Sequence, residues 1–265
     1  MLRHTCDTTA ETPGHGGGTV GAMNKTRHLV LTGLFLATTA CSGQSAATGQ
    51  APGLTKVLLL GDSIAVGEAL PLAAAFDAGG VAFESAAAEG GGNVVGPFAE
   101  EAWKKLPDQI ADADPTVVVY QLTTYDWGTE QEQRAAYEKL LGAVTDADAT
   151  LVFVTAPPIR PDDFYRPHLA DLERAPDVAR AVAAASPDEA TMLDAATVWG
   201  DAYQQVRDGK ADRGADGIHT CPQGAARFTH WLLDELAELF PGFTPPNPEE
   251  WANTGWSADG HFKGC

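Results

Sequence analysis

The stretch KVLLLGDSIAVG, residues 56–67, contains the features that decide the fold. Its first part is a short run of apolar residues, which is typical of a strand buried on both faces of a parallel sheet. Gly61 then permits a sharp turn into a predicted helix. Ser63 therefore falls at the start of that helix, where free backbone N–H groups and the helix dipole favour a developing negative charge. The other interpretation of Ser63 is a plain helix N-cap.

Short apolar runs alternate with amphipathic segments from residue 56 onward. Pro71 is expected to kink or break the first helix. The alternation predicts one flavodoxin-like domain, a three-layer α/β/α sandwich with a parallel five-stranded sheet, whose functional loops follow the carboxyl ends of the strands. Strands are predicted at 57–60, 80–83, 116–122, 150–155 and 191–193, and helices at 64–76, 100–113, 130–145, 175–185 and 222–240.

The composition excludes some classes of function. The 265 residues include 17 basic and 36 acidic side chains, for a formal net charge of −19. Such a surface repels phosphate backbones, so nucleic acid is not an expected partner. The sequence also has no metal-ligand cluster, no phosphate-binding glycine loop and no dinucleotide fingerprint, so no cofactor is expected.

The N-terminal region has the pattern of an export signal. A basic segment at 23–28 precedes an apolar run at 29–36, which is too short to span a bilayer permanently. We expect a signal peptide at 23–40, with Met23 as the start and residues 1–22 as a mis-assigned extension. Cys41 follows Thr38-Thr39-Ala40 in a pattern that resembles a bacterial lipobox, although Leu is usual where Thr38 stands.

This pattern predicts a lipoprotein on the outer face of the cell membrane, with Cys41 lipidated, residues 41–55 as a flexible tether and the lipid as its only membrane contact. The alternative is an ordinary cleaved signal and a secreted protein. Export leaves Cys221 and Cys265 as a pair, for which we expect a disulfide; the alternative is two free thiols. The disulfide would hold the tail, residues 241–265, which has little else to anchor it.

Asp216 and His219 stand three residues apart, close before the last predicted helix. Within one turn this spacing can place both side chains on the same side. The carboxylate could then accept the Nδ1–H of the imidazole, fix its tautomer and stabilise the imidazolium that forms when it takes a proton from a serine. The spacing alone is equally compatible with a solvated surface turn.

Together, Gly61-Asp62-Ser63 after the first strand and Asp216-Gly217-Ile218-His219 before the last helix resemble the first and last blocks of the SGNH (GDSL-like) hydrolases. The resemblance covers residues 56–240. The order is Ser, Asp, His, with Asp and His almost adjacent. This near adjacency, and the absence of a Gly-x-Ser-x-Gly elbow, separate the sequence from the α/β-hydrolases. The resemblance implies a catalytic triad of Ser63, Asp216 and His219.

The resemblance also implies an oxyanion hole formed by the backbone amides of Ser63 and Gly90, with Gly92 as the runner-up. The family's third block is Gly-x-Asn-Asp, but here Tyr125 stands at the Asn position. Three explanations stay open: two amides suffice, at some loss of rate; Asn93 or the Tyr125 hydroxyl supplies a third donor; or the protein is a weakly active or inactive relative.

Tyr125-Asp126 is similar to SGNH domains associated with envelope-polysaccharide acyltransferases. Asp126, Arg160 and Tyr165 are candidate substrate-binding residues, the last two on a loop after the fourth strand that could equally be a structural crossover. The expected function is a serine esterase that hydrolyses short-chain, acetyl-like O-acyl esters on small molecules, cell-envelope glycans or lipids through an acyl-serine intermediate. The alternatives are an O-acyltransferase to a sugar hydroxyl and a catalytically silent glycan-binding lipoprotein.

Overall fold

The computed structural model describes residues 53–265, and the structural statements below concern that part of the chain. The predicted signal peptide, Cys41 and the tether up to residue 52 lie outside it. The central sheet has five parallel strands in the order β2-β1-β3-β4-β5. The predicted flavodoxin-like α/β architecture is confirmed. The strands are β1 (Lys56–Leu60), β2 (Ala82–Ser85), β3 (Val117–Gln121), β4 (Thr150–Val154) and β5 (Ala190–Leu193).

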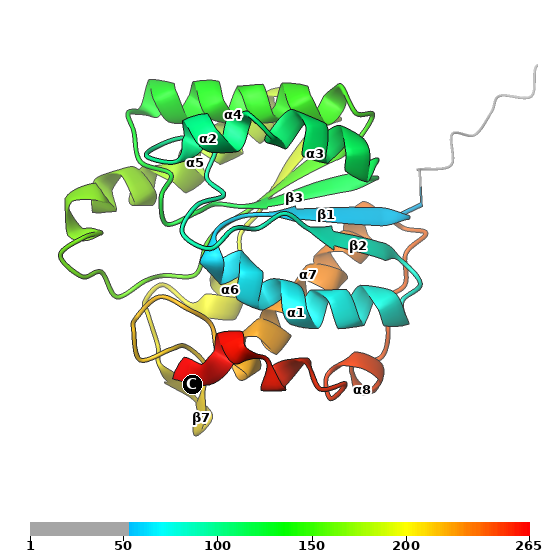
Figure 1. Cartoon of the computed structure of the whole chain (residues 1–265). Coiled ribbons are helices and arrows are strands. Elements are labelled where there is room, and N and C mark those ends of the chain that lie inside the picture. Colours follow the sequence, from blue (N-terminus) through cyan, green and yellow to red (C-terminus); the bar gives the residue numbers. More distant parts are fainter. Residues whose placement is uncertain (1–52) are drawn as a thin grey trace, which may run out of the picture. The chain divides into compact units, whose positions relative to one another are not determined.

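Alternate residues of the strands enter two separate cores, one on each face of the sheet. On β3, Val117 and Val119 face one core, whereas Val118 and Tyr120 face the other. Helices cover both faces, as Figure 1 shows. The first face is covered by α1 (Ser63–Ala78), α6 (Ala196–Trp199), α7 (Pro222–Leu239) and α8 (Pro248–Trp251), and the second by α2 (Ala99–Trp103), α3 (Leu106–Ala113), α4 (Glu130–Thr145) and α5 (Leu169–Ala185).

Several predicted boundaries were wrong for local reasons. The predicted helix 100–113 is two helices, α2 and α3, and the second begins with Pro107 in its first turn. Pro71 does not end α1, which continues to Ala78 because Leu72, Ala75 and Phe76 are fully buried beyond it. Helix α5 starts at Leu169, six residues before the predicted start.

The prediction that the tail has little to hold it was also wrong. Residues 241–265 contain α8 and the 3-10 helices η2 (Trp256–Ala258) and η3 (Gly260–Gly264). Phe243, Trp251 and Phe262 are all buried, and the first two belong to the same core as α1 and α7. The tail is therefore packed by apolar side chains as well as by a disulfide. Smaller elements that were not predicted are η1 (Arg166–His168) and the hairpin of β6 (Val206–Arg207) and β7 (Lys210–Ala211).

Candidate active site

The turn between β1 and α1 presents Ser63 at the carboxyl end of the sheet. Gly61 has a φ of 154°, and a Cβ there would lie 2.6 Å from that of Ala65, so the tight turn requires glycine. Asp62 is the N-cap of α1 and accepts a hydrogen bond from the Ile64 amide at 3.0 Å. Ser63 is therefore not the cap, and its hydroxyl is free for another partner.

Asp62 also joins the turn to the loop after β3. Its other carboxylate oxygen accepts bonds from the amide and the hydroxyl of Thr124, both at 2.8 Å. Burial raises the pKa of the Asp62 carboxyl, although the Thr124 bonds oppose that rise. The side chain thus fixes the nucleophile turn from within the protein.

Ser63, Asp216 and His219 form a continuous hydrogen-bonded chain. The Ser63 Oγ lies 2.8 Å from Nε2 of His219, and Nδ1 of the same ring lies 2.8 Å from Asp216 Oδ2. The other oxygen of Asp216 accepts bonds from the backbone amides of Ile218 and His219, at 2.8 and 3.1 Å. Partial burial works to raise the pKa of Asp216, but these hydrogen bonds outweigh it and lower the pKa. Asp216 is therefore ionised and oriented to stabilise an imidazolium.

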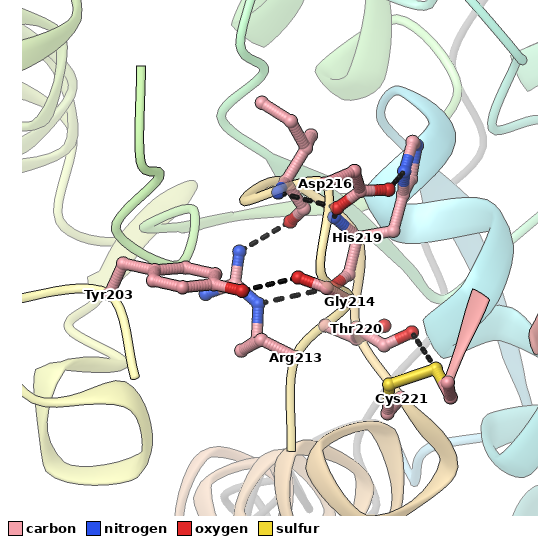
Figure 2. Close-up of a disulfide and its surroundings, with 9 residues drawn as sticks. Tyr203, Arg213, Gly214, Asp216, His219, Thr220 and Cys221 are labelled. Atoms are coloured by element: carbon pink, nitrogen blue, oxygen red, sulfur yellow. Dashed lines mark hydrogen bonds and ion pairs between the residues drawn. A yellow bond between two sulfur atoms is a disulfide. The ribbon is translucent and has the colours of Figure 1, made fainter. Parts of the chain in front are cut away.

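The loop that carries Asp216 and His219 is held by Arg213, which is buried (Figure 2). Its guanidinium donates to the carbonyls of Ile218, of His219 at 3.4 Å and of Pro158 at 2.9 Å. Tyr203 Oη donates to the Gly214 carbonyl on the same loop. These side chains were not anticipated, since a lone Arg near an Asp-x-x-His motif carries no distinctive sequence signal.

Arg160, predicted to bind substrate, instead supports this loop. Its guanidinium donates to the Ala215 carbonyl, and its backbone amide donates to the Gly217 carbonyl at 2.8 Å. Gly217 has a φ of 89°, and a Cβ there would lie 2.9 Å from the Arg160 carbonyl oxygen. The contacts of Arg160 are therefore those expected if the 157–168 loop is a structural crossover.

The two glycines proposed for the oxyanion hole differ in position. Gly92 is packed against the nucleophile turn, since a Cβ there would lie 1.9 Å from the Gly61 carbonyl oxygen. A Cβ on Gly90 would meet nothing within 4 Å, and Gly90 is exposed. The close contact favours the runner-up, Gly92. Asn93 is fully buried and donates one of its two amide hydrogens to the Val95 carbonyl at 2.6 Å.

Tyr125 is the centre of an aromatic cluster beside the triad. Its ring packs edge-on against Phe98 and Phe164, with centroids 5.3 and 6.3 Å away, and both of these side chains are exposed. Its hydroxyl lies 3.5 Å from that of Tyr165, which is itself buried against Ile64. Burial raises the pKa of Tyr125, so the phenol stays protonated.

Tyr165 and Asp126 therefore do not have the positions expected of substrate contacts. Tyr165 is buried and contacts Tyr125 through its hydroxyl and its ring. Asp126 is fully buried and accepts bonds from Tyr120 Oη at 2.7 Å, Thr123 Oγ1 at 2.9 Å and Tyr137 Oη at 2.9 Å. Burial raises its pKa to about 6 despite these bonds. Its role is to anchor the loop after β3.

The expected disulfide between Cys221 and Cys265 is present, with Cα atoms 5.6 Å apart (Figure 2). Cys221 is the N-cap residue of α7 and stands two residues after His219. The tail is thus covalently attached beside the catalytic loop.

The cavity nearest the 157–168 loop has a volume of about 400 Å³ and is lined by residues that follow β3 and β4, including Thr124 and Ile159.

Within residues 53–265, no group of three or more His, Cys, Asp or Glu side chains could hold a metal ion. No helix in this region is long and apolar enough to cross a membrane.

Several solved structures have a fold similar to that of this chain. A protein from Slackia heliotrinireducens assigned to the SGNH hydrolases superposes with a TM-score of 0.52 at 20% identity, over 69% of this chain and all of the other. A GDSL-like lipase from Bacteroides thetaiotaomicron gives 0.53 at 12% identity, over 70% and 89% of the two chains. The chain has the SGNH hydrolase fold.

A variant of an acetyl-xylooligosaccharide esterase from Geobacillus Stearmophilus is also similar in structure, with a TM-score of 0.52 at 13% identity, over 71% and 96% of the chains. No sequence-family model and no curated protein matches the chain. The likeness to the SGNH hydrolases therefore lies in the three-dimensional structure and in the two motifs.

Proposed function

We propose that this protein is a serine esterase that hydrolyses O-acyl esters through an acyl-serine intermediate. The observation that carries the proposal is the complete hydrogen-bonded chain from Ser63 through His219 to Asp216, with 2.8 Å at both links. Three residues with these distances and these roles are what nucleophilic acyl transfer requires. A silent binding protein would have no need to keep this geometry.

In the reaction, the Ser63 Oγ attacks the acyl carbonyl carbon while Nε2 of His219 takes the hydroxyl proton. The Asp216 carboxylate stabilises the resulting imidazolium. Collapse of the tetrahedral intermediate breaks the bond to the alcohol oxygen, which leaves with the proton from His219. Water then attacks the acyl-serine, with His219 again as the base, and releases the acid and the free serine.

The negative oxygen of the intermediate is held by backbone amides. The Ser63 amide lies at the N-terminus of α1, where the helix dipole favours negative charge. We assign the second amide to Gly92, because its backbone is pressed against the nucleophile turn. We assign the Tyr125 hydroxyl, which burial keeps protonated, as a further donor in place of the family's Asn.

For substrate, we propose acetyl-like esters on cell-envelope glycans or lipids, encountered outside the membrane by a lipid-anchored protein. Support comes from the predicted signal and lipobox, from the disulfide, and from the exposed aromatic rings of Phe98 and Phe164, which both pack against Tyr125. Aromatic rings of this kind offer apolar faces with defined geometry to a ring or an acyl group. An acetylated oligosaccharide is the first compound class to test.

The experiment compares hydrolysis of p-nitrophenyl acetate, butyrate and octanoate by the purified protein and by its Ser63→Ala variant. We expect activity that is greatest with acetate and falls by about a thousandfold or more in the variant. Ser257→Ala, an exposed serine on η2, is the matched control and should keep full activity. Folded protein that hydrolyses none of the esters would contradict the esterase proposal.

An O-acyltransferase would form the same acyl-enzyme but pass the acyl group to a sugar hydroxyl. Product analysis in the presence of an oligosaccharide acceptor separates the two activities. We expect free acid as the main product. An acylated oligosaccharide in excess over free acid would assign the protein to the transferases instead.

A further inference from the structure

We propose that His261, on the tail, is a positioning residue of the active site that holds both the catalytic histidine and the loop of oxyanion glycines. The inference rests on the proposed function and extends the site beyond the segment that resembles the SGNH family. Three contacts, to three different parts of the chain, carry it.

The first contact is with the catalytic histidine. The rings of His261 and His219 meet edge to face, with centroids 5.7 Å apart and planes at 90°. The side chain of His261 is only 11% exposed, so it is enclosed by its neighbours and cannot turn away freely. It therefore opposes rotation of the His219 ring away from the orientation in which Nε2 faces Ser63 and Nδ1 faces Asp216.

The second contact is with the glycine loop after β2. Nδ1 of His261 lies 3.2 Å from Glu89 Oε1, and Glu89 directly precedes Gly90. Glu89 and Gly90 are both exposed, and the nearest backbone bond before them runs from the Ala88 amide to the Gly61 carbonyl, at 3.0 Å. A hydrogen bond from the imidazole to the carboxylate thus ties the loop to the tail. Glu89, His261, His219 and Asp216 line one cavity of about 300 Å³ beside the triad.

The third contact explains a glycine inside α1. A Cβ on Gly67 would lie 2.6 Å from Nε2 and 2.8 Å from Cδ2 of His261. Gly in a helix interior is otherwise unfavourable relative to Ala. Gly67 lies one turn after Ser63, so the room for His261 is made in the same helix that carries the nucleophile.

The backbone of His261 is fixed as well. Its amide donates to Asp259 Oδ1 at 2.8 Å, the adjacent Phe262 is buried, and the disulfide at Cys265 follows within one short helix. The ring therefore reaches the site from a segment that is anchored on both sides of it.

These contacts give His261 a role in positioning other residues and no role in transferring the serine proton. Nδ1 of His261 is engaged by Glu89, and Nε2 faces α1 and is buried without a hydrogen-bond partner among the described residues. Neither nitrogen bonds to Ser63. His261 acts through His219 and the glycine loop, so its loss should lower the rate of the chemical step more than it weakens substrate binding.

The test uses Gly67→Ala and His261→Ala in the purified protein. The first variant improves helix propensity but displaces the imidazole, so it separates the proposed effect from a loss of folding. We expect both to lower kcat for p-nitrophenyl acetate about 10-fold or more, with KM changed less than about threefold. Lys263→Ala, exposed on the same short helix, is the control and should keep wild-type values.

A further variant separates the effect of the hydrogen bond to Glu89 from the effect of the imidazole ring itself. Asn can place its amide near the position of Nδ1, so His261→Asn should retain most of the bond to Glu89 and recover part of the kcat that is lost in His261→Ala. The loss that remains measures the contact of the ring with His219. Glu89→Ala removes only the contact with the glycine loop, so it should lower kcat less than His261→Ala. The double variant should be little worse than His261→Ala, because the Glu89 contact is already lost there.

Hydrogen exchange of the peptide that spans residues 86–93 provides a readout that needs no activity. We expect faster exchange in His261→Ala and Gly67→Ala than in wild type, and no change in Lys263→Ala. An inactive wild type that shows this pattern would overturn the proposed function and leave the positioning role standing. Wild-type kcat together with wild-type exchange in both variants would overturn the positioning role.

Discussion

The two halves of the triad are built in different ways. Ser63 is placed by its own neighbours, because Gly61 makes the turn and Asp62 caps the helix. Asp216 and His219 stand on a loop with no regular secondary structure, bounded by a single bridge between Arg213 and Thr220. That loop is held by side chains from distant parts of the sequence.

The nucleophile turn therefore depends mainly on adjacent residues, with the bonds from Thr124 to Asp62 as an added support, whereas the acid–base pair depends on side chains from several distant segments. The turn should resist substitutions elsewhere in the chain, whereas the loop should lose its geometry when any of its remote supports is removed. Each of the following changes acts on one side of this comparison.

The largest effect is expected from removing the disulfide with Cys265→Ser. A link that closes a loop across 44 residues restricts the unfolded chain, so its loss should lower the free energy of unfolding by about 3 kcal/mol. Chemical denaturation measures this, and wild type under reducing conditions should behave in the same way. Because Phe243, Trp251 and Phe262 still pack the tail, the variant should remain folded at room temperature. Unchanged stability would show that the apolar contacts alone hold the tail.

A smaller effect is expected from Arg213→Lys. Lysine keeps the charge but cannot reach three carbonyls at once, so the loop should loosen and kcat should fall about 10- to 100-fold. Arg134→Lys, at a partly exposed position on α4, is the matched control. Full activity in Arg213→Lys would mean that the loop keeps its shape without this side chain. It would contradict the claim that the acid–base loop depends on distant supports.

The smallest effect concerns the buried carboxyls behind the nucleophile turn. Burial raises the pKa of Asp62 and of Glu68, and that of Asp126 to about 6. A carboxyl whose pKa is higher in the folded state contributes stability below its unfolded pKa of about 4, and this contribution is lost as the pH rises through the folded pKa.

We therefore expect the free energy of unfolding to fall between pH 5 and pH 7, as measured by urea denaturation. Glu68→Gln, which stays neutral, should flatten part of this dependence. The lowered pKa of Asp216 acts below pH 4 and does not enter this window. A free energy of unfolding that rises from pH 5 to pH 7 would contradict the expectation.

The parts of this fold that depend on short-range pattern could be predicted from the sequence. Buried strands show as apolar runs, and the Gly-Asp-Ser turn and the Asp-x-x-His spacing identified residues that the structure brings within hydrogen-bond distance. The disulfide was predicted from the cysteine count together with the predicted export signal.

What could not be predicted depends on contacts between distant segments. Asp126 was taken for a substrate contact because it follows Tyr125, but tyrosines from β3 and α4 enclose it. Arg160 was expected to face substrate, but the Gly217 turn lies against it. The approach of His261 to His219 depends on the whole path of the tail, for which no local pattern exists.

The central claim is that Ser63 is a nucleophile activated by His219. Intact-mass analysis of the protein after treatment with a fluorophosphonate tests it without knowledge of the substrate. The account predicts a single covalent adduct on Ser63, no adduct in Ser63→Ala, and labelling slowed by about a hundredfold or more in His219→Ala. Folded wild-type protein that stays unlabelled, or an adduct that persists in Ser63→Ala, would contradict it.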